Sequence, residues 1–93
     1  MTTNSIDALG NLACQSAMRG ASDWLLKHKP NEPRDYARIT DCIKQHLKAA
    51  MIEGLADAKM ALEAGMHPSI AEQTFLASCT LAGINAAKEA VGA

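Results

Sequence analysis

Apolar residues recur at helical spacing along nearly the whole chain. In the first third they occupy positions three or four residues apart: Ile6, Leu9, Ala13, Ala17, Ala21, Trp24 and Leu25. This spacing predicts a helix from about Ser5 to Lys29, with Asn4 or Ser5 as its cap and Pro30 ending it. Three of these positions, Ala13, Ala17 and Ala21, form a strip of small side chains. Such a strip predicts a close approach by another helix.

The segment Pro30–Pro33 is the one clear linker, and the apolar pattern resumes after it. A second helix is predicted from about Pro33, whose missing N–H is tolerated in a first turn, to Ala64. Gly65 is suited to the left-handed conformation that ends a helix. A helix of this length measures about 45 Å, whereas a compact globule of this size is about 30 Å across. Two alternatives follow, a bend near Gly54 or an elongated molecule.

A third helix is predicted from near His67–Ser69 to about Val91, with Gly92 ending it. Two starts are open. Ser69 and Glu72 have the spacing of a capping box. Alternatively, His67 precedes the helix and Pro68 takes its first position. The expected fold is therefore all-α, a three-helix unit that forms a single domain over residues 1–93.

The third predicted helix carries no charge between Gln73 and Ala87. A helix that is apolar all round is normally buried, and two helices of one short chain leave part of it uncovered. We therefore expect a helical homo-oligomer, whose interface would be formed by Ile70, Thr74, Phe75, Ala77, Leu81, Ala82 and Ile84. In one alternative, Ser78, Thr80, Gly83 and Asn85 form a neutral face toward solvent. In the other, this helix docks onto a different protein.

Composition narrows the class of protein. The formal net charge of −1 argues against general nucleic-acid binding. The three cysteines are an odd number without paired spacing, which favours a reducing compartment over a disulfide framework. The N-terminus lacks the pattern of a signal peptide, and no apolar run is long enough for a membrane span. The sequence thus predicts a cytoplasmic protein.

Basic residues gather around the first linker. Lys27, Lys29, Arg34, Tyr36 and Arg38 lie near the predicted start of the second helix. Because a helix N-terminus with nearby arginines attracts anions, these five residues are a candidate site for a phosphate-containing ligand. The alternative is an ordinary solvated surface, since several of the charges have oppositely charged neighbours three or four residues away.

Motifs for catalysis or cofactors are lacking. The sequence has no glycine-rich phosphate loop and no nucleophile elbow. Cys42 and His46 have a spacing that suits a metal, but no second pair completes a site. We expect no enzyme, no cofactor and no metal; an active site shared between subunits is the remaining alternative.

A binding function is therefore the leading hypothesis. Small size and alanine-rich helices resemble accessory proteins of phages and mobile elements. Leu76–Ala77, Leu81, Ala86 and Lys88 resemble, in order, residues in the last helix of oligomeric phage anti-defence proteins that sequester cyclic-nucleotide signals. The spacing differs by two residues and the Trp and Glu positions are absent, so no binding residue is transferred. The hypothesis is an oligomeric inhibitor or adaptor with a protein partner; the alternative is a protein that sequesters a nucleotide-like anion.

Overall fold

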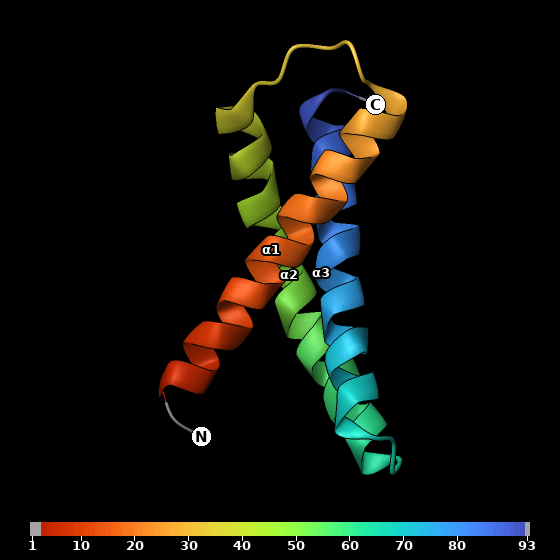
Figure 1. The fold of residues 1–93 in the computed structure, drawn as a ribbon. Helices are drawn as coiled ribbons and strands as arrows, with labels where there is room; N and C mark the ends of the chain where they lie inside the picture. The colour runs from red at the N-terminus through yellow and green to blue at the C-terminus, as the bar shows by residue number, and fades with distance from the viewer. Residues whose placement is uncertain (1–2, 93) are drawn as a thin grey trace.

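Three helices make up the protein. The computed structural model describes residues 3–92, and the side chains of residues 10–92. The helices are α1 (Thr3–His28), α2 (Tyr36–Glu63) and α3 (Pro68–Ala90). No strand occurs over residues 3–92, so the all-helical, three-helix expectation is confirmed. The linker from 29 to 35 joins α1 to α2 at one end of the molecule, and a short turn joins α2 to α3 at the other (Figure 1).

The boundaries of α1 and α2 differ from the predicted ones by a few residues. Helix α1 begins at Thr3, so neither Asn4 nor Ser5 precedes it as a cap. Helix α2 begins at Tyr36 and not at Pro33, because the side chain of Asp35 accepts a hydrogen bond from the main-chain N–H of Arg38 at 3.1 Å. An aspartate in this position satisfies one of the free N–H groups of a first turn. Pro33 therefore lies in the linker.

The turn residues agree with the sequence. Gly65 has φ +85° and Gly92 has φ +74°, so both adopt the left-handed conformation predicted for them. The start of α3 follows the second of the two predicted alternatives. His67 caps it, and its Nδ1 accepts from the main-chain N–H of Ser69 at 3.1 Å, while Pro68 occupies the first turn.

Helix α2 is continuous through Gly54, and the molecule is elongated. Its principal dimensions are 44 × 25 × 17 Å, and the long one is about the length of a 28-residue helix. Gly54 serves packing: a Cβ on it would lie 3.0 Å from the Phe75 ring of α3. The radius of gyration, 14.2 Å, exceeds the value of about 12 Å for a compact chain of this length.

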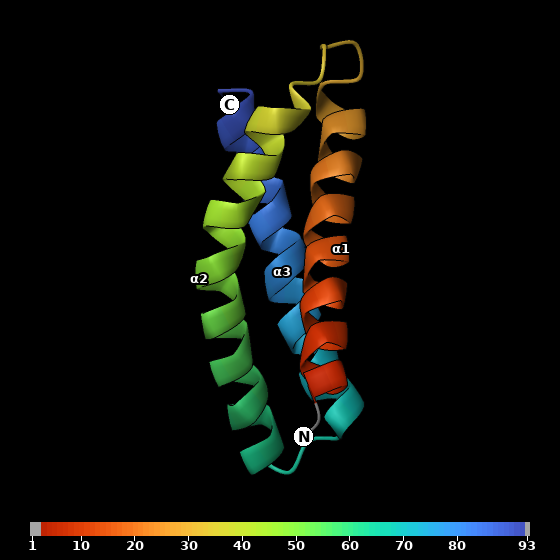
Figure 2. The same cartoon turned by 90° about the vertical axis from the view of Figure 1, so that its left-hand side faces the viewer.

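Helix α3 lies between the other two helices (Figure 2). It packs extensively against both α1 and α2, whereas α1 and α2 hardly contact each other. Among the described residues, Phe75 and Cys79 of α3 are the largest of the fully buried side chains. The rest of the core is mostly alanine on α1 and isoleucine and leucine on α2. Two helices are thus held together by a third.

The contact between α1 and α3 is a backbone contact. A Cβ on Gly83 would overlap the carbonyl group of Ala17, and a Cβ on Gly20 would lie 2.5 Å from the Thr80 carbonyl oxygen. Ala13, Ala17 and Ala21 are all buried here, which confirms the close approach predicted for the alanine strip. It also corrects one alternative, because Gly83 is covered by α1 and does not face solvent.

Polar contacts fasten α2 to the C-terminal end of α3. The Nε of Arg38 donates to the carbonyl oxygen of Ala90 at 2.9 Å. About two turns farther along α2 lies His46, whose Nε2 pairs with the carboxylate of Glu89. A cation near the last carbonyl groups of a helix also suits the helix dipole. These contacts join residues far apart in the sequence and fix the relative position of the two helices.

The contact between α1 and α3 predicts a strong effect of one methyl group. We expect Gly83→Ala to lower the free energy of unfolding by at least about 2 kcal/mol, because the added Cβ forces two backbones apart. Gly10→Ala is the matched control, since a Cβ there meets nothing within 4 Å and alanine favours helix by about 0.5–1 kcal/mol. Urea denaturation monitored by circular dichroism measures both. Equal stability of the two variants would contradict the proposed crossing.

Candidate functional site

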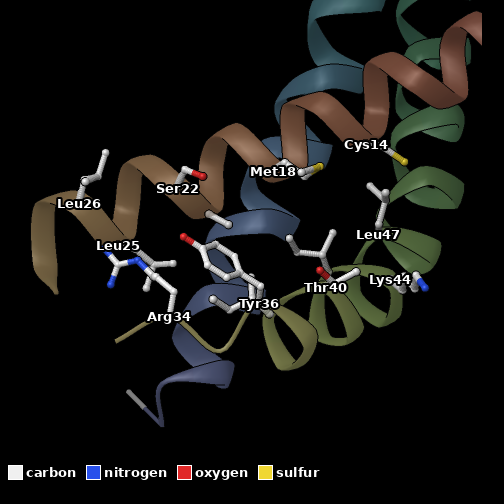
Figure 3. A pocket seen from close by; sticks show the side chains of 13 residues that line it. Cys14, Met18, Ser22, Leu25, Leu26, Arg34, Tyr36, Thr40, Lys44 and Leu47 are labelled. Carbon is white, nitrogen blue, oxygen red and sulfur yellow. The ribbon is translucent and has the colours of Figure 1, made fainter. Parts of the chain in front are cut away.

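An open cleft lies between α1 and α2, in the space that their separate packing on α3 leaves. Its volume is about 440 Å³. Its walls come from both helices and from the linker (Figure 3). The lining residues are Cys14, Met18, Ala21, Ser22, Leu25, Leu26, Arg34, Tyr36, Ile39, Thr40, Ile43, Lys44 and Leu47. The volume lies within the range typical of binding sites.

The surface of the cleft is mostly apolar, with two cations. Met18 and Leu26 are exposed along the α1 side, and Tyr36, 73% exposed, projects from the start of α2 toward α1 (Figure 3). The charged residues among the lining side chains described are Arg34 and Lys44, both positive. The recess is therefore apolar and positively charged, although the whole protein has a net charge of −1.

The structure disperses the five residues of the predicted anion site. Arg34 and Tyr36 line the cleft, while Lys27, Lys29 and Arg38 do not. The Nη1 of Arg34 donates to the carbonyl oxygens of Lys29 at 2.9 Å and Glu32 at 2.7 Å, which holds the linker in shape. Arg38 is engaged with α3. Both guanidinium groups thus have structural partners, and binding of a phosphate by this set stays a prediction.

A second, smaller recess of about 230 Å³ lies between α2 and α3. It is more polar than the cleft, and its lining residues are His46, Ala49, Ala50, Glu53, Ser78, Leu81, Ala82 and Asn85. The pairing of His46 with Glu89 lies at its edge. Its charged residues already have neighbours of the opposite sign or face solvent, so the larger cleft is the stronger candidate.

The residues predicted to form an oligomer interface on α3 fall into two groups. Phe75 and Ala82 are buried inside the chain's own core, so they do not form an outer surface. Ile70, Ala77 and Leu81 are exposed, and Thr74 and Ile84 are half-buried. The two helices of the same chain therefore cover more of α3 than the sequence indicated, and five of the seven residues remain available to a second molecule.

Apart from Arg34 and Tyr36, the residues that line the cleft were not identified as a site from the sequence. Met18, Leu25 and Leu26 of α1 face Ile39, Ile43 and Leu47 of α2 across it. The spacing of these residues is helical, and it indicates membership of a helix face. Which two faces would be left opposite each other depends on how both helices pack against α3. The one available signal was that α1 carries large apolar residues in addition to the small residues of the alanine strip, which packs on α3.

The three cysteines have different environments. Cys42 and Cys79 are buried, while Cys14 is exposed in the cleft wall. Burial raises the pKa of the Cys79 thiol, with a smaller contribution from nearby Cys14. Among the side chains described, no group of three or more His, Cys, Asp or Glu residues is placed to hold a metal ion. Cys42 packs in the core and its helical neighbour His46 faces Glu89.

These environments predict selective thiol chemistry. In the native protein at pH 8, at a concentration at which the cleft is unoccupied, we expect iodoacetamide to modify Cys14 at least about tenfold faster than Cys42 or Cys79. Exposure controls access, and a raised pKa lowers the reactive thiolate fraction of Cys79. Peptide mass spectrometry over a time course measures the three rates, with the urea-unfolded chain as control. Comparable rates in the native state would contradict the burial of the two core cysteines.

Comparisons with known proteins add no relative to this description of the site. None of the helices, within residues 3–92, combines the length and apolar character of a membrane span. Searches against protein-family models, curated proteins and solved structures found no match.

Proposed function

We propose that the protein is a non-enzymatic binding protein that receives an amphipathic, acidic helix of a partner in the cleft between α1 and α2. The observation that carries the proposal is the cleft itself, an apolar recess with two positive residues in its lining. Binding of a helix in an apolar groove is a recurrent mode of protein recognition.

The arrangement of the helices suits a helical ligand. Helices α1 and α2 both pack on α3 and leave a space between them. A helix in that space would contact both, and would complete a four-helix arrangement of the kind found in bundles. The cleft follows α1 from Cys14 to Leu26 and α2 from Tyr36 to Leu47. It therefore offers three turns of each helix as walls.

The free energy of such binding comes from the exposed apolar side chains. Full burial of one large apolar side chain contributes about 1.5–3 kcal/mol, whereas association costs at least about 4 kcal/mol. About three such side chains must be covered before binding becomes favourable. Met18, Leu26 and Tyr36 at the cleft mouth supply that number.

Charge favours an acidic partner. Arg34 and Lys44 line the cleft, and acidic side chains are missing from the part of the lining that the structure describes. Complementary charges at the rim of an interface select the partner more than they add affinity. A basic amphipathic helix would bring like charges together and would bind less well.

A pair of synthetic peptides tests the proposal. Both would be 16-residue amphipathic helices with leucine on one face; one has glutamate and the other lysine at the flanking positions. We expect the glutamate peptide to bind at least about tenfold more tightly by isothermal titration calorimetry, and to slow alkylation of Cys14. Equal affinity for both peptides, or binding without protection of Cys14, would show that the cleft is not the binding site.

Two lysines of α2 provide a matched pair of variants. Lys44→Glu should weaken binding of the glutamate peptide about three- to tenfold, because it replaces an attraction with a repulsion at the rim. Lys48→Glu is the control, since Lys48 is exposed on the same helix but does not line the cleft. Equal effects of the two substitutions would indicate a general charge effect, and would count against the cleft.

A further inference from the structure

The apolar side of α2 continues beyond the cleft. Past Leu47, the same face of the helix carries Met51, Leu55, Ala58 and Leu62. Leu55 is 47% exposed and Leu62 is 49% exposed, and Met51 and Ala58 pack only partly against the core. Leu47 is buried in the core and meets this surface where it lines the cleft. We call the positions Thr40, Lys44, Leu47, Met51, Leu55, Ala58 and Leu62 the α2 stripe.

The spacing of residues in the α2 stripe is the same when it is counted from either end. Its steps are 4, 3, 4, 4, 3 and 4 residues, with Met51 in the centre. A stripe with this symmetry matches an antiparallel copy of itself. Leu47 then faces Leu55 of the second copy, and Met51 faces Met51 across a two-fold axis.

The charges of α2 favour the same orientation. Residues 34–48 contain four basic and two acidic residues, a net charge of +2, and residues 49–66 contain one basic and three acidic residues, a net charge of −2. An antiparallel pair places each positive half on a negative half, whereas a parallel pair stacks like on like. On the flank of the stripe, Asp41 comes opposite Lys59 of the second copy.

We propose that the cleft is occupied by a second copy of this chain, in a symmetric dimer built on antiparallel α2 helices. Leu55, Ala58 and Leu62 of each copy lie in the α1–α2 cleft of the other. The inference rests on the proposed function, because it assigns the cleft's helical ligand. It also makes dimerisation and binding of an external helix mutually exclusive. The interface is isologous, because a two-fold axis brings the same surface of both copies together.

The exposed side of α3 is a weaker candidate for self-association. Its two large exposed apolar residues, Ile70 and Leu81, lie about three helical turns apart. The α2 stripe instead combines large apolar side chains with an adjoining recess that receives them. A dimer through α2 therefore covers both surfaces at once.

Light scattering after size-exclusion chromatography tests the dimer. The expected mass is twice the 9.8 kDa of one chain. Leu55→Glu and Leu62→Glu should each raise the dimer dissociation constant more than tenfold, because they place a charge in an apolar interface. Met60→Glu is the matched control, since Met60 is an exposed apolar residue on another face of α2. A single-chain mass at 1 mM, or equal dissociation by all three variants, overturns the proposal.

Two further measurements guard against misfolded variants. In a Cys14→Ser background, Met51→Cys should form an intermolecular disulfide under mild oxidation, because the two-fold axis brings this position against itself. Asp41→Lys should weaken the dimer and Lys59→Asp should restore it in the double variant. Circular dichroism confirms the helical fold in each case. Lack of cross-linking in a folded variant, or lack of restoration, contradicts the antiparallel register.

The glutamate peptide separates this inference from the proposed function. If both hold, adding the peptide converts the dimer into a one-to-one complex of chain and peptide. Peptide binding to a protein that is a monomer at every concentration overturns the dimer and leaves the function intact. A dimer that persists at saturating peptide overturns the shared site.

Discussion

The close contact between the backbones of α1 and α3 is the constraint on which the rest of this structure depends. Gly83 leaves no room for a side chain against Ala17, and Gly20 approaches Thr80 in the same way. With α1 fixed on one side of α3 and α2 on another, the two outer helices remain apart. The cleft is thus a direct result of small residues at one crossing point. The core on the α2 side, where Phe75 lies against Gly54, is built differently and holds the larger side chains.

Much of the fold was predictable because local signals agreed with each other. Helical spacing, the prolines and the glycines at 65 and 92 gave the number and order of the helices. The boundary at Pro33 was wrong because an aspartate cap two residues later starts α2 more effectively. The neutral flank of α3 was ambiguous for another reason. Periodicity identifies the face of a helix that is buried when that face alone is apolar. A helix that is apolar on several sides gives no indication of which neighbour covers each side.

The candidate site was less predictable than the fold. The cleft is lined from two helices that hardly contact each other, so its composition depends on the position of the third. The charged cluster around the linker was visible in the sequence, but its partners were not. Arg38 reaches the carbonyl group of Ala90, 52 positions away, and Arg34 holds the main chain of the linker. The cluster of positive charge near the start of α2 therefore indicated a region of the surface. It did not indicate the hydrogen-bond partners of the two arginines.

The single interface that holds α1 has a mechanical consequence. Helices α2 and α3 are joined by a short turn, by the core around Phe75 and by two polar contacts, whereas α1 is joined to them through α3 and a seven-residue linker. The placement of α1 on α3 therefore sets the width of the cleft, whereas the α2–α3 pair is held by contacts of its own. A substitution that displaced α1 on α3 would change the shape of the binding recess without touching any residue of α2.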